Sequence, residues 1–268
     1  MGNFYKNWAI GDLRAEYDRK YRERRGGDDV KSAESFCGHF CPLEEECRRR
    51  MEGDYDKEYE KEFLVKRYER SVAGRQFEEY ESIRNTGALE ETLEYLVNLP
   101  LDYKSYKFID NRIRAIKADL ESLSGIVGDS VCPDKIHMLE TISRFYVVSL
   151  YVLYTVENDL YQVMEQLRKT LNVLMHEYNS CNQYSNEFVE YYILSNMEKS
   201  ETVERTISRY APSKLNCINE ALVLFNSFVS QDYGAIFGYK RCFLFYCITL
   251  YYHNMLRISV VRLLKKGI

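Results

Sequence analysis

The stretch Tyr106–Leu123, YKFIDNRIRAIKADLESL, decides the fold class of this chain. Its apolar residues recur at steps of four, three, four and three, which places them on one face of a helix of about five turns. These residues are Ile109, Ile113, Ile116, Leu120 and Leu123. Charged residues lie between them, so we expect the helix to pack along one side and to present charge on the others. Gly125 and Gly128 are predicted to end it.

The rest of the chain is predicted to form further helices around this one. The charged segment Asp56–Ser71 is predicted as a helix, and the end of the chain as two helices, Tyr239–His253 and Asn254–Lys266. The other predicted helices are Leu89–Leu99, Pro133–Leu153, Val163–Tyr178, Asn186–Met197, Glu201–Tyr210, Lys214–Val229 and Tyr233–Phe237. No stretch alternates apolar and polar residues as a half-buried strand does. The expected fold is all-α, with paired antiparallel helices in an α-solenoid or bundle.

Composition and charge restrict the class of protein. The chain has 268 residues, of which 46% are hydrophobic, so it can bury a sizeable core. Its net charge of −4 gives no general attraction for nucleic acid, and any such binding has to be local. The opening residues lack the apolar region of a secretory signal, and the longest apolar run, Phe145–Val156, is too short to span a bilayer. We therefore expect an intracellular protein without membrane contact, whose eight cysteines are reduced thiols.

Two parts are expected along the chain. Residues 1–35 are charged and contain the pair Gly26-Gly27, which predicts a partly flexible N-terminal segment. Residues 36–268 are predicted to form one helical-repeat domain, although no fixed repeat period is visible.

The segment FCGHFCPLEEECRRR, residues 36–50, has two interpretations. Its Cys37, His39, Cys41 and Cys47 are residue types that bind zinc. The spacing matches no usual paired zinc knuckle, however, and no second CxxC follows. The favoured interpretation is a turn with Pro42 at the first helical position, followed by three glutamates near the positive end of a new helix.

No arrangement of residues predicts catalysis. Phosphate-binding loops, dinucleotide-binding glycines, a nucleophile elbow and an HExxH zinc motif are all missing, and the four histidines lie far apart in the sequence. We predict a protein that is not an enzyme, with no cofactor, no bound metal and no small-molecule substrate.

The end of the chain is strongly basic. From residue 240 onward there are six cations and no Asp or Glu. The cations are Lys240, Arg241, Arg257, Arg262, Lys265 and Lys266. They either complement the negative end of the last helix or form an edge that contacts RNA phosphates or an acidic partner.

Several of these stretches resemble the GANP family, also called the leucine-permease transcriptional regulator family (yeast Sac-three type). The family's Cys-x3-Cys-Pro-x-x-Glu hallmark is similar to Cys37, Cys41, Pro42 and Glu45, and its RSAAG element to Arg70, Ser71, Ala73 and Gly74. Its conserved helix resembles Phe108, Asn111, Arg112, Arg114, Ala115, Ile116, Lys117 and Asp119, with Asn111 in place of the usual Asp. Further similar residues are Leu89, Thr92, Tyr95 and Leu96, then Arg144-Phe145, Glu165-Gln166-Leu167, and Glu187-Phe188 with Tyr191.

The resemblance implies a scaffold with a TPR-like helical-repeat platform. Family members pair with a PCI-domain protein and a small acidic disordered protein, and they couple transcription to mRNA export at the nuclear pore. The family's C-terminal winged helix is not visible in this sequence. The motif residues are expected to be structural first, because buried charges persist only when paired, and the basic end becomes the candidate contact for RNA or a partner. A proteasome-lid or signalosome-type subunit and a centrosome-associated scaffold in the cytoplasm remain alternatives.

Overall fold

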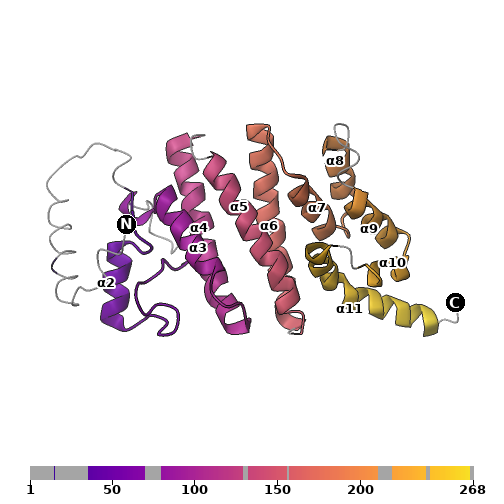
Figure 1. Ribbon diagram of the computed structural model, residues 1–268, viewed down its shortest axis with the longest axis horizontal. Coiled ribbons are helices and arrows are strands. Elements are labelled where there is room, and N and C mark those ends of the chain that lie inside the picture. Colours follow the sequence, from indigo (N-terminus) through magenta and orange to yellow (C-terminus); the bar gives the residue numbers. More distant parts are fainter. Residues whose placement is uncertain are drawn as a thin grey trace. The chain divides into compact units, whose positions relative to one another are not determined.

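The computed structural model describes residue 15 and residues 36–69, 80–128, 132–155, 157–210, 219–239 and 242–265. Over these residues the regular elements are helices, and the single β-type pairing is an isolated bridge between Cys37 and Arg84 (Figure 1). The chain divides into two compact units, Met1–Pro100 with Lys107–Val131 and Leu101–Tyr106 with Cys132–Ile268. The fold is all-α, as predicted. The predicted boundary near residue 35 stays a prediction, because residues 16–35 lie outside the described part.

The first unit is built on the predicted central helix. Its elements are α2 (Leu43–Glu52), the short 3-10 helix η2 (Tyr80–Ser82), α3 (Thr86–Val97) and most of α4 (Tyr103–Val127). All five apolar positions of the predicted stripe on α4 are at most 2% exposed. Gly125 does not end this helix, because one glycine in a last turn costs only about 1 kcal/mol. Gly128 follows α4 with φ 77°, a left-handed conformation that favours glycine.

The predicted helix over Asp56–Ser71 is wrong. Residues 56–69 are irregular, and residues 70–71 lie outside the described part. Backbone amides of this segment bond to a side chain or to another segment: Val65 N donates to the side chain of Glu60 (Oε1, 3.1 Å), and Lys66 N donates to Phe40 O (2.9 Å). Apart from one i to i−4 bond, from Glu60 N to Asp56 O, such contacts take the place of the helical ladder that the local charge pattern favours.

The second unit consists of helices throughout its described residues. They are α5 (Cys132–Val152), α6 (Glu157–Cys181), α7 (Asn186–Ser195), α8 (Ser200–Tyr210), α9 (Asn219–Val229), α10 (Tyr233–Phe237) and α11 (Phe243–Lys265). Helices α5 and α6 form the most extensive pair and lie side by side (Figure 1). Helix α11 packs against α5, α7 and α10.

Two predictions about this unit are wrong. Residues 243–265 form one helix where two were predicted. The polar residue His253, where the break was predicted, does not interrupt the helix, because its ring packs against that of Phe237 with 5.1 Å between the ring centres. The expectation of reduced thiols fails for Cys132 and Cys181, which form a disulfide between the first residue of α5 and the last of α6. The other cysteines of the described part are free thiols.

A buried arginine joins three helices of this unit. Arg168 on α6 is 5% exposed, and its Nε donates to the carbonyl oxygen of Ser195 at the end of α7 (2.7 Å). The hydroxyl of Tyr252 on α11 donates to the same carbonyl (2.9 Å) and accepts a bond from Arg168 Nη2 (3.4 Å). One backbone oxygen therefore holds α6, α7 and α11 together.

We expect Arg168→Met to lower the free energy of unfolding by about 2 kcal/mol, because the buried polar groups around Ser195 lose a charged donor. Urea unfolding followed by circular dichroism measures the change. The control is Arg205→Met, which removes an exposed i,i+4 ion pair with Glu201 and should cost less than about 0.5 kcal/mol. Equal losses in the two variants would show that the Arg168 contacts add no more than surface charge.

Candidate functional site

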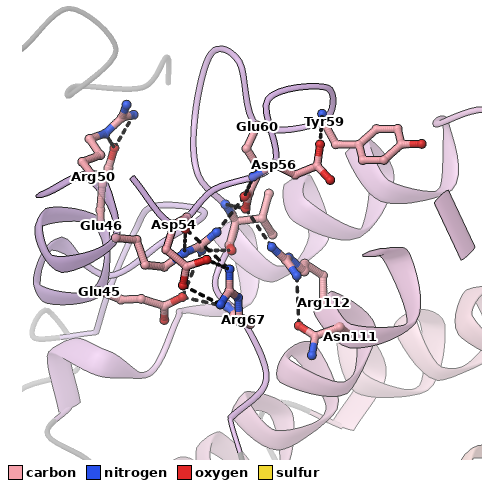
Figure 2. Close-up of polar contacts among 12 residues, drawn as sticks. Glu45, Glu46, Arg50, Asp54, Asp56, Tyr59, Glu60, Arg67, Asn111 and Arg112 are labelled. Carbon is pink, nitrogen blue, oxygen red and sulfur yellow. Dashed lines mark hydrogen bonds and ion pairs between the residues drawn. The ribbon is translucent and has the colours of Figure 1, made fainter. Parts of the chain in front are cut away.

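The buried charges of the first unit centre on Glu60. Arg49 from α2 and Arg112 from α4 approach it from different elements, with Arg49 Nη2 2.6 Å from Oε2 and Arg112 Nη2 3.1 Å from Oε1. The side chains of Glu60 and Arg49 are fully buried and that of Arg112 is 7% exposed. We call these three residues the Glu60 cluster; Glu60 and Arg112 are labelled in Figure 2. The carboxylate also accepts hydrogen bonds from the backbone amides of Asp56 (2.9 Å, to Oε2) and Val65 (3.1 Å, to Oε1). Each of its oxygens therefore accepts two hydrogen bonds, one from an arginine and one from the backbone.

Besides Glu60, Arg49 bonds to two backbone carbonyls and to a second glutamate. Its Nε donates to Asp54 O (3.0 Å) and its Nη1 to Val65 O (2.9 Å) and Glu45 Oε1 (3.1 Å). Glu45 accepts a further bond from the backbone amide of Arg67 (2.9 Å). The glutamate of the predicted hallmark therefore positions an arginine and a loop.

The electrostatics keep this carboxylate charged. Burial alone would raise the pKa of Glu60, but the guanidinium groups of Arg112 and Arg49 outweigh burial and hold the pKa below its ordinary value. Burial lowers the pKa of Arg112, and Glu60 partly restores it. Proton transfer near neutral pH needs a group that titrates there, so the Glu60 cluster is suited to fixing chain geometry.

Asp119 forms a second buried site on α4, about two turns beyond Arg112 on the same face. Its Oδ1 lies 2.5 Å from Lys66 Nζ and its Oδ2 2.7 Å from Arg84 Nε. Lys66 also donates to Ser82 O (2.8 Å). The backbone at Arg84 pairs with that at Cys37. Asp119 thus ties α4 directly to two irregular segments, at Lys66 and at Arg84, and through the bridge of Arg84 to a third segment at Cys37.

Asn111 explains the departure from the family's usual Asp. Its Oδ1 accepts the backbone amide of Tyr68 and its Nδ2 donates to the carbonyl of Tyr68, both at 3.2 Å. A carboxylate can only accept, so the amide is the side chain that satisfies both backbone groups. Arg114 lies over the ring of Tyr68, 4.2 Å from its centre, so this predicted residue also packs on the irregular segment.

The remaining predicted residues of the first unit have structural positions or lie outside the described part. Cys37 and Cys41 are buried, and burial raises the pKa of both thiols. Pro42 is the residue before α2, one position earlier than predicted. No three His, Cys, Asp or Glu side chains of the described part are grouped to hold a metal ion. The predicted residues Arg70, Ser71 and Gly74 lie outside the described part.

Four of the family-like residues of the second unit meet in one place. Arg144 donates to both oxygens of Glu187, from Nε at 2.8 Å and from Nη2 at 2.7 Å. Tyr191 donates its hydroxyl to the same carboxylate (2.7 Å), and Arg144 lies 4.8 Å from the ring centre of Phe188. The bond from Arg144 is the main reason that the pKa of Glu187 is lowered. Phe145, which follows Arg144 in the sequence, is buried.

The basic end is only partly described. Arg257, Arg262 and Lys265 are exposed on the C-terminal half of α11, and Arg257 Nη1 bonds to the hydroxyl of Tyr154 (3.1 Å). The predicted contact residues Lys240, Arg241 and Lys266 lie outside the described part.

Four partners of these clusters were missed from the sequence: Arg49, Glu60, Lys66 and Arg84. Arg49 is one of three consecutive arginines, and Glu60 stands in a run of alternating charges. The local sequence therefore does not distinguish either residue from neighbours whose side chains are in water. The signals that could have found them were the i,i+4 pair of Glu45 with Arg49 and the apolar residues Leu64-Val65 beside Glu60.

Fold and clusters together define a class: an all-α protein whose helices and irregular segments are held by buried ion pairs. The SAC3/GANP family model matches residues 40–268, most of the chain. The chain belongs to the SAC3/GANP family, which is a family of scaffold proteins. No solved structure matches the chain significantly. None of the helices in the described residues has the length and hydrophobicity needed to cross a membrane.

We expect Glu60→Gln to lower the free energy of unfolding by about 3–5 kcal/mol at pH 7, because it leaves two buried guanidinium groups without their anion. Glu69→Gln is the control: it removes an ion pair with Arg48 whose side chains are 40% and 41% exposed, worth at most about 1 kcal/mol. Urea unfolding measures both.

The same pair of variants has a pH dependence. The folded pKa of Glu60 lies below the unfolded value, so its contribution is present above the unfolded pKa and is lost as pH falls through the folded pKa. The difference in the free energy of unfolding between wild type and Glu60→Gln should therefore become smaller below about pH 4. A gap that stays constant down to pH 3 contradicts the ionised state of Glu60.

The carboxylate of Glu190 on α7 should have the opposite effect on the pH dependence of stability, because its pKa is raised and not lowered. Burial, with the charges of Glu220 on α9 and of Glu187, raises the pKa of Glu190 to about 7. A raised folded pKa means that the folded state binds the extra proton, so stability falls as pH rises from the unfolded to the folded value. We expect Glu190→Gln to stabilise the chain by about 1 kcal/mol at pH 8, after allowance for partial exposure, and far less at pH 5. The exposed Glu204→Gln should show no such pH dependence.

Proposed function

We propose that this chain is a non-enzymatic scaffold that couples transcription to nuclear mRNA export. One observation carries the proposal: the family model matches residues 40–268. The charged residues that resemble family motifs support it, because Arg112 and Asp119 form buried ion pairs and Arg144 pairs with Glu187 at a partly exposed site. The charges of these residues pair with other groups of the same chain and fix the positions of its segments. The surfaces, and not the clusters, are then what the scaffold offers to partners.

The proposed partners are those that the family resemblance implies. They are a PCI-domain protein, a small acidic disordered subunit and mRNA, and the proposed location of the complex is the nuclear pore. The basic end, with Arg257, Arg262 and Lys265 exposed on α11, is the proposed contact surface for one of them. Its cations are concentrated in a segment without acidic residues, which provides the local attraction that the chain's net charge of −4 does not.

The test is mass spectrometry of proteins that co-purify with the tagged chain from its own cells, with and without RNase. We expect a PCI-domain protein, a small acidic chain and nuclear-pore or mRNP components. A variant with Arg257, Arg262, Lys265 and Lys266 changed to Gln should recover at least about fivefold less of the partner or RNA that contacts the basic end, because the cations supply its electrostatic attraction.

The matched control changes four exposed cations elsewhere, Lys57, Lys61, Lys199 and Arg209, to Gln and should co-purify like the wild type. Proteasome-lid, signalosome or centrosomal proteins in place of export factors would overturn the proposed role.

A further inference from the structure

The C-terminal half of α11 is only partly covered by the second unit. The first half of the helix is buried through residues such as Ile248, Tyr252 and Leu256. Beyond Leu256 the described side chains are exposed or half-buried, and in Figure 1 this end of α11 extends past α10. Three of the exposed side chains are aliphatic: Ile258 is 54%, Val261 50% and Leu264 68% exposed.

These side chains share a face with cations. Ile258, Val261, Arg262 and Lys265 are spaced i, i+3, i+4 and i+7, which places all four on one side of a helix. We call these four residues the outer face of α11. Two branched aliphatic groups thus lie within about two turns of two cations, and no Asp or Glu follows residue 240 to neutralise them.

We propose that the outer face of α11 binds an amphipathic helix of a partner protein, one that carries aliphatic side chains along its contact face and Asp or Glu at its margin. This rests on the proposed scaffold function and names the class of partner at its basic end. The aliphatic groups of such a helix remove Ile258 and Val261 from water, and its carboxylates pair with Arg262 and Lys265 at the rim. Charge complementarity therefore selects an acidic partner.

RNA fits this face less well. Bases are held on single-strand binding proteins by stacking on aromatic rings, and residues 254–265 contain no aromatic side chain. Phosphate contacts with the cations would leave Ile258 and Val261 in water. A second copy of the chain fits less well too, because two outer faces would bring four cations together.

The probe is a fluorescein-labelled 20-residue helical peptide with leucines along one face and glutamates beside them, and its twin has glutamine in place of every glutamate. Anisotropy titrations use the full chain at 50 and 200 mM salt. We expect the acidic peptide to bind at least tenfold more tightly than its twin at 50 mM salt. The difference should shrink at 200 mM salt, because salt screens the rim charges.

Variants separate the two halves of the proposal. The double variant Ile258→Glu, Val261→Glu should weaken peptide binding at least tenfold, and Arg262→Gln, Lys265→Gln should weaken it and flatten its salt dependence. Val223→Glu changes an aliphatic residue on α9 that is 60% exposed and should leave binding unchanged. Each variant's thermal midpoint must match the wild type, and if the double glutamate variant does not fold, Ile258→Ser, Val261→Ser replaces it.

Three results overturn the inference. One is equal or absent binding of the two peptides. Another is tight binding of a labelled 20-nucleotide single-stranded RNA that Arg262→Gln, Lys265→Gln abolishes and Ile258→Glu, Val261→Glu does not, which would make this a phosphate-binding edge. The third is a dimer in sedimentation velocity that Ile258→Glu, Val261→Glu dissolves. Because the titration uses purified protein and a synthetic peptide, it can fail while the cellular co-purification succeeds, and the reverse.

Discussion

The pairing of one buried carboxylate with two arginines governs the first unit. Glu60 is fully buried, and Arg49 and Arg112 reach it from α2 and α4. Removing a carboxylate from water is costly, and the cost is offset only while both guanidinium groups and two backbone amides remain in contact with it. This requirement fixes the path of an irregular segment that has no helical ladder of its own. The same logic recurs at Asp119, with Lys66 and Arg84 as its cations.

The second unit solves its packing with less buried charge. Its main pair, α5 and α6, is held by buried apolar residues, by the Cys132–Cys181 disulfide and by an ion pair of Lys135 with Glu177. Arg168 adds a polar junction among α6, α7 and α11. The ion pair of Arg144 with Glu187 is 44% and 31% exposed, so it orients helices while remaining in contact with water. A helix can satisfy its own backbone, whereas an irregular segment needs side chains to do so. This difference explains why the buried ion pairs concentrate in the first unit.

The helices were largely predictable because helical spacing is a local signal. The stripe on α4 is buried as its period indicated, and α10 has the predicted bounds. The prediction failed at residues 56–69, where alternating charges imitate a solvated helix although Glu60 and Lys66 serve contacts 52 and 53 residues away. Long-range partners leave no local period. The resemblance located Arg112 and Asp119, but it could not name Glu60, Arg49, Lys66 or Arg84 as the groups that they meet.

A division of labour follows from where the charges lie. Charges of the Glu60 and Asp119 sites are buried and paired, so an external ligand that competed for them would have to break the fold first. The cations of the outer face of α11 are exposed and share that face with Ile258 and Val261. Burial of aliphatic groups contributes binding free energy that salt does not screen, while cations at the margin favour a partner of negative charge. If the chain binds partners as proposed, such faces are where it would do so, and their specificity could change without disturbing the ion pairs that hold the fold.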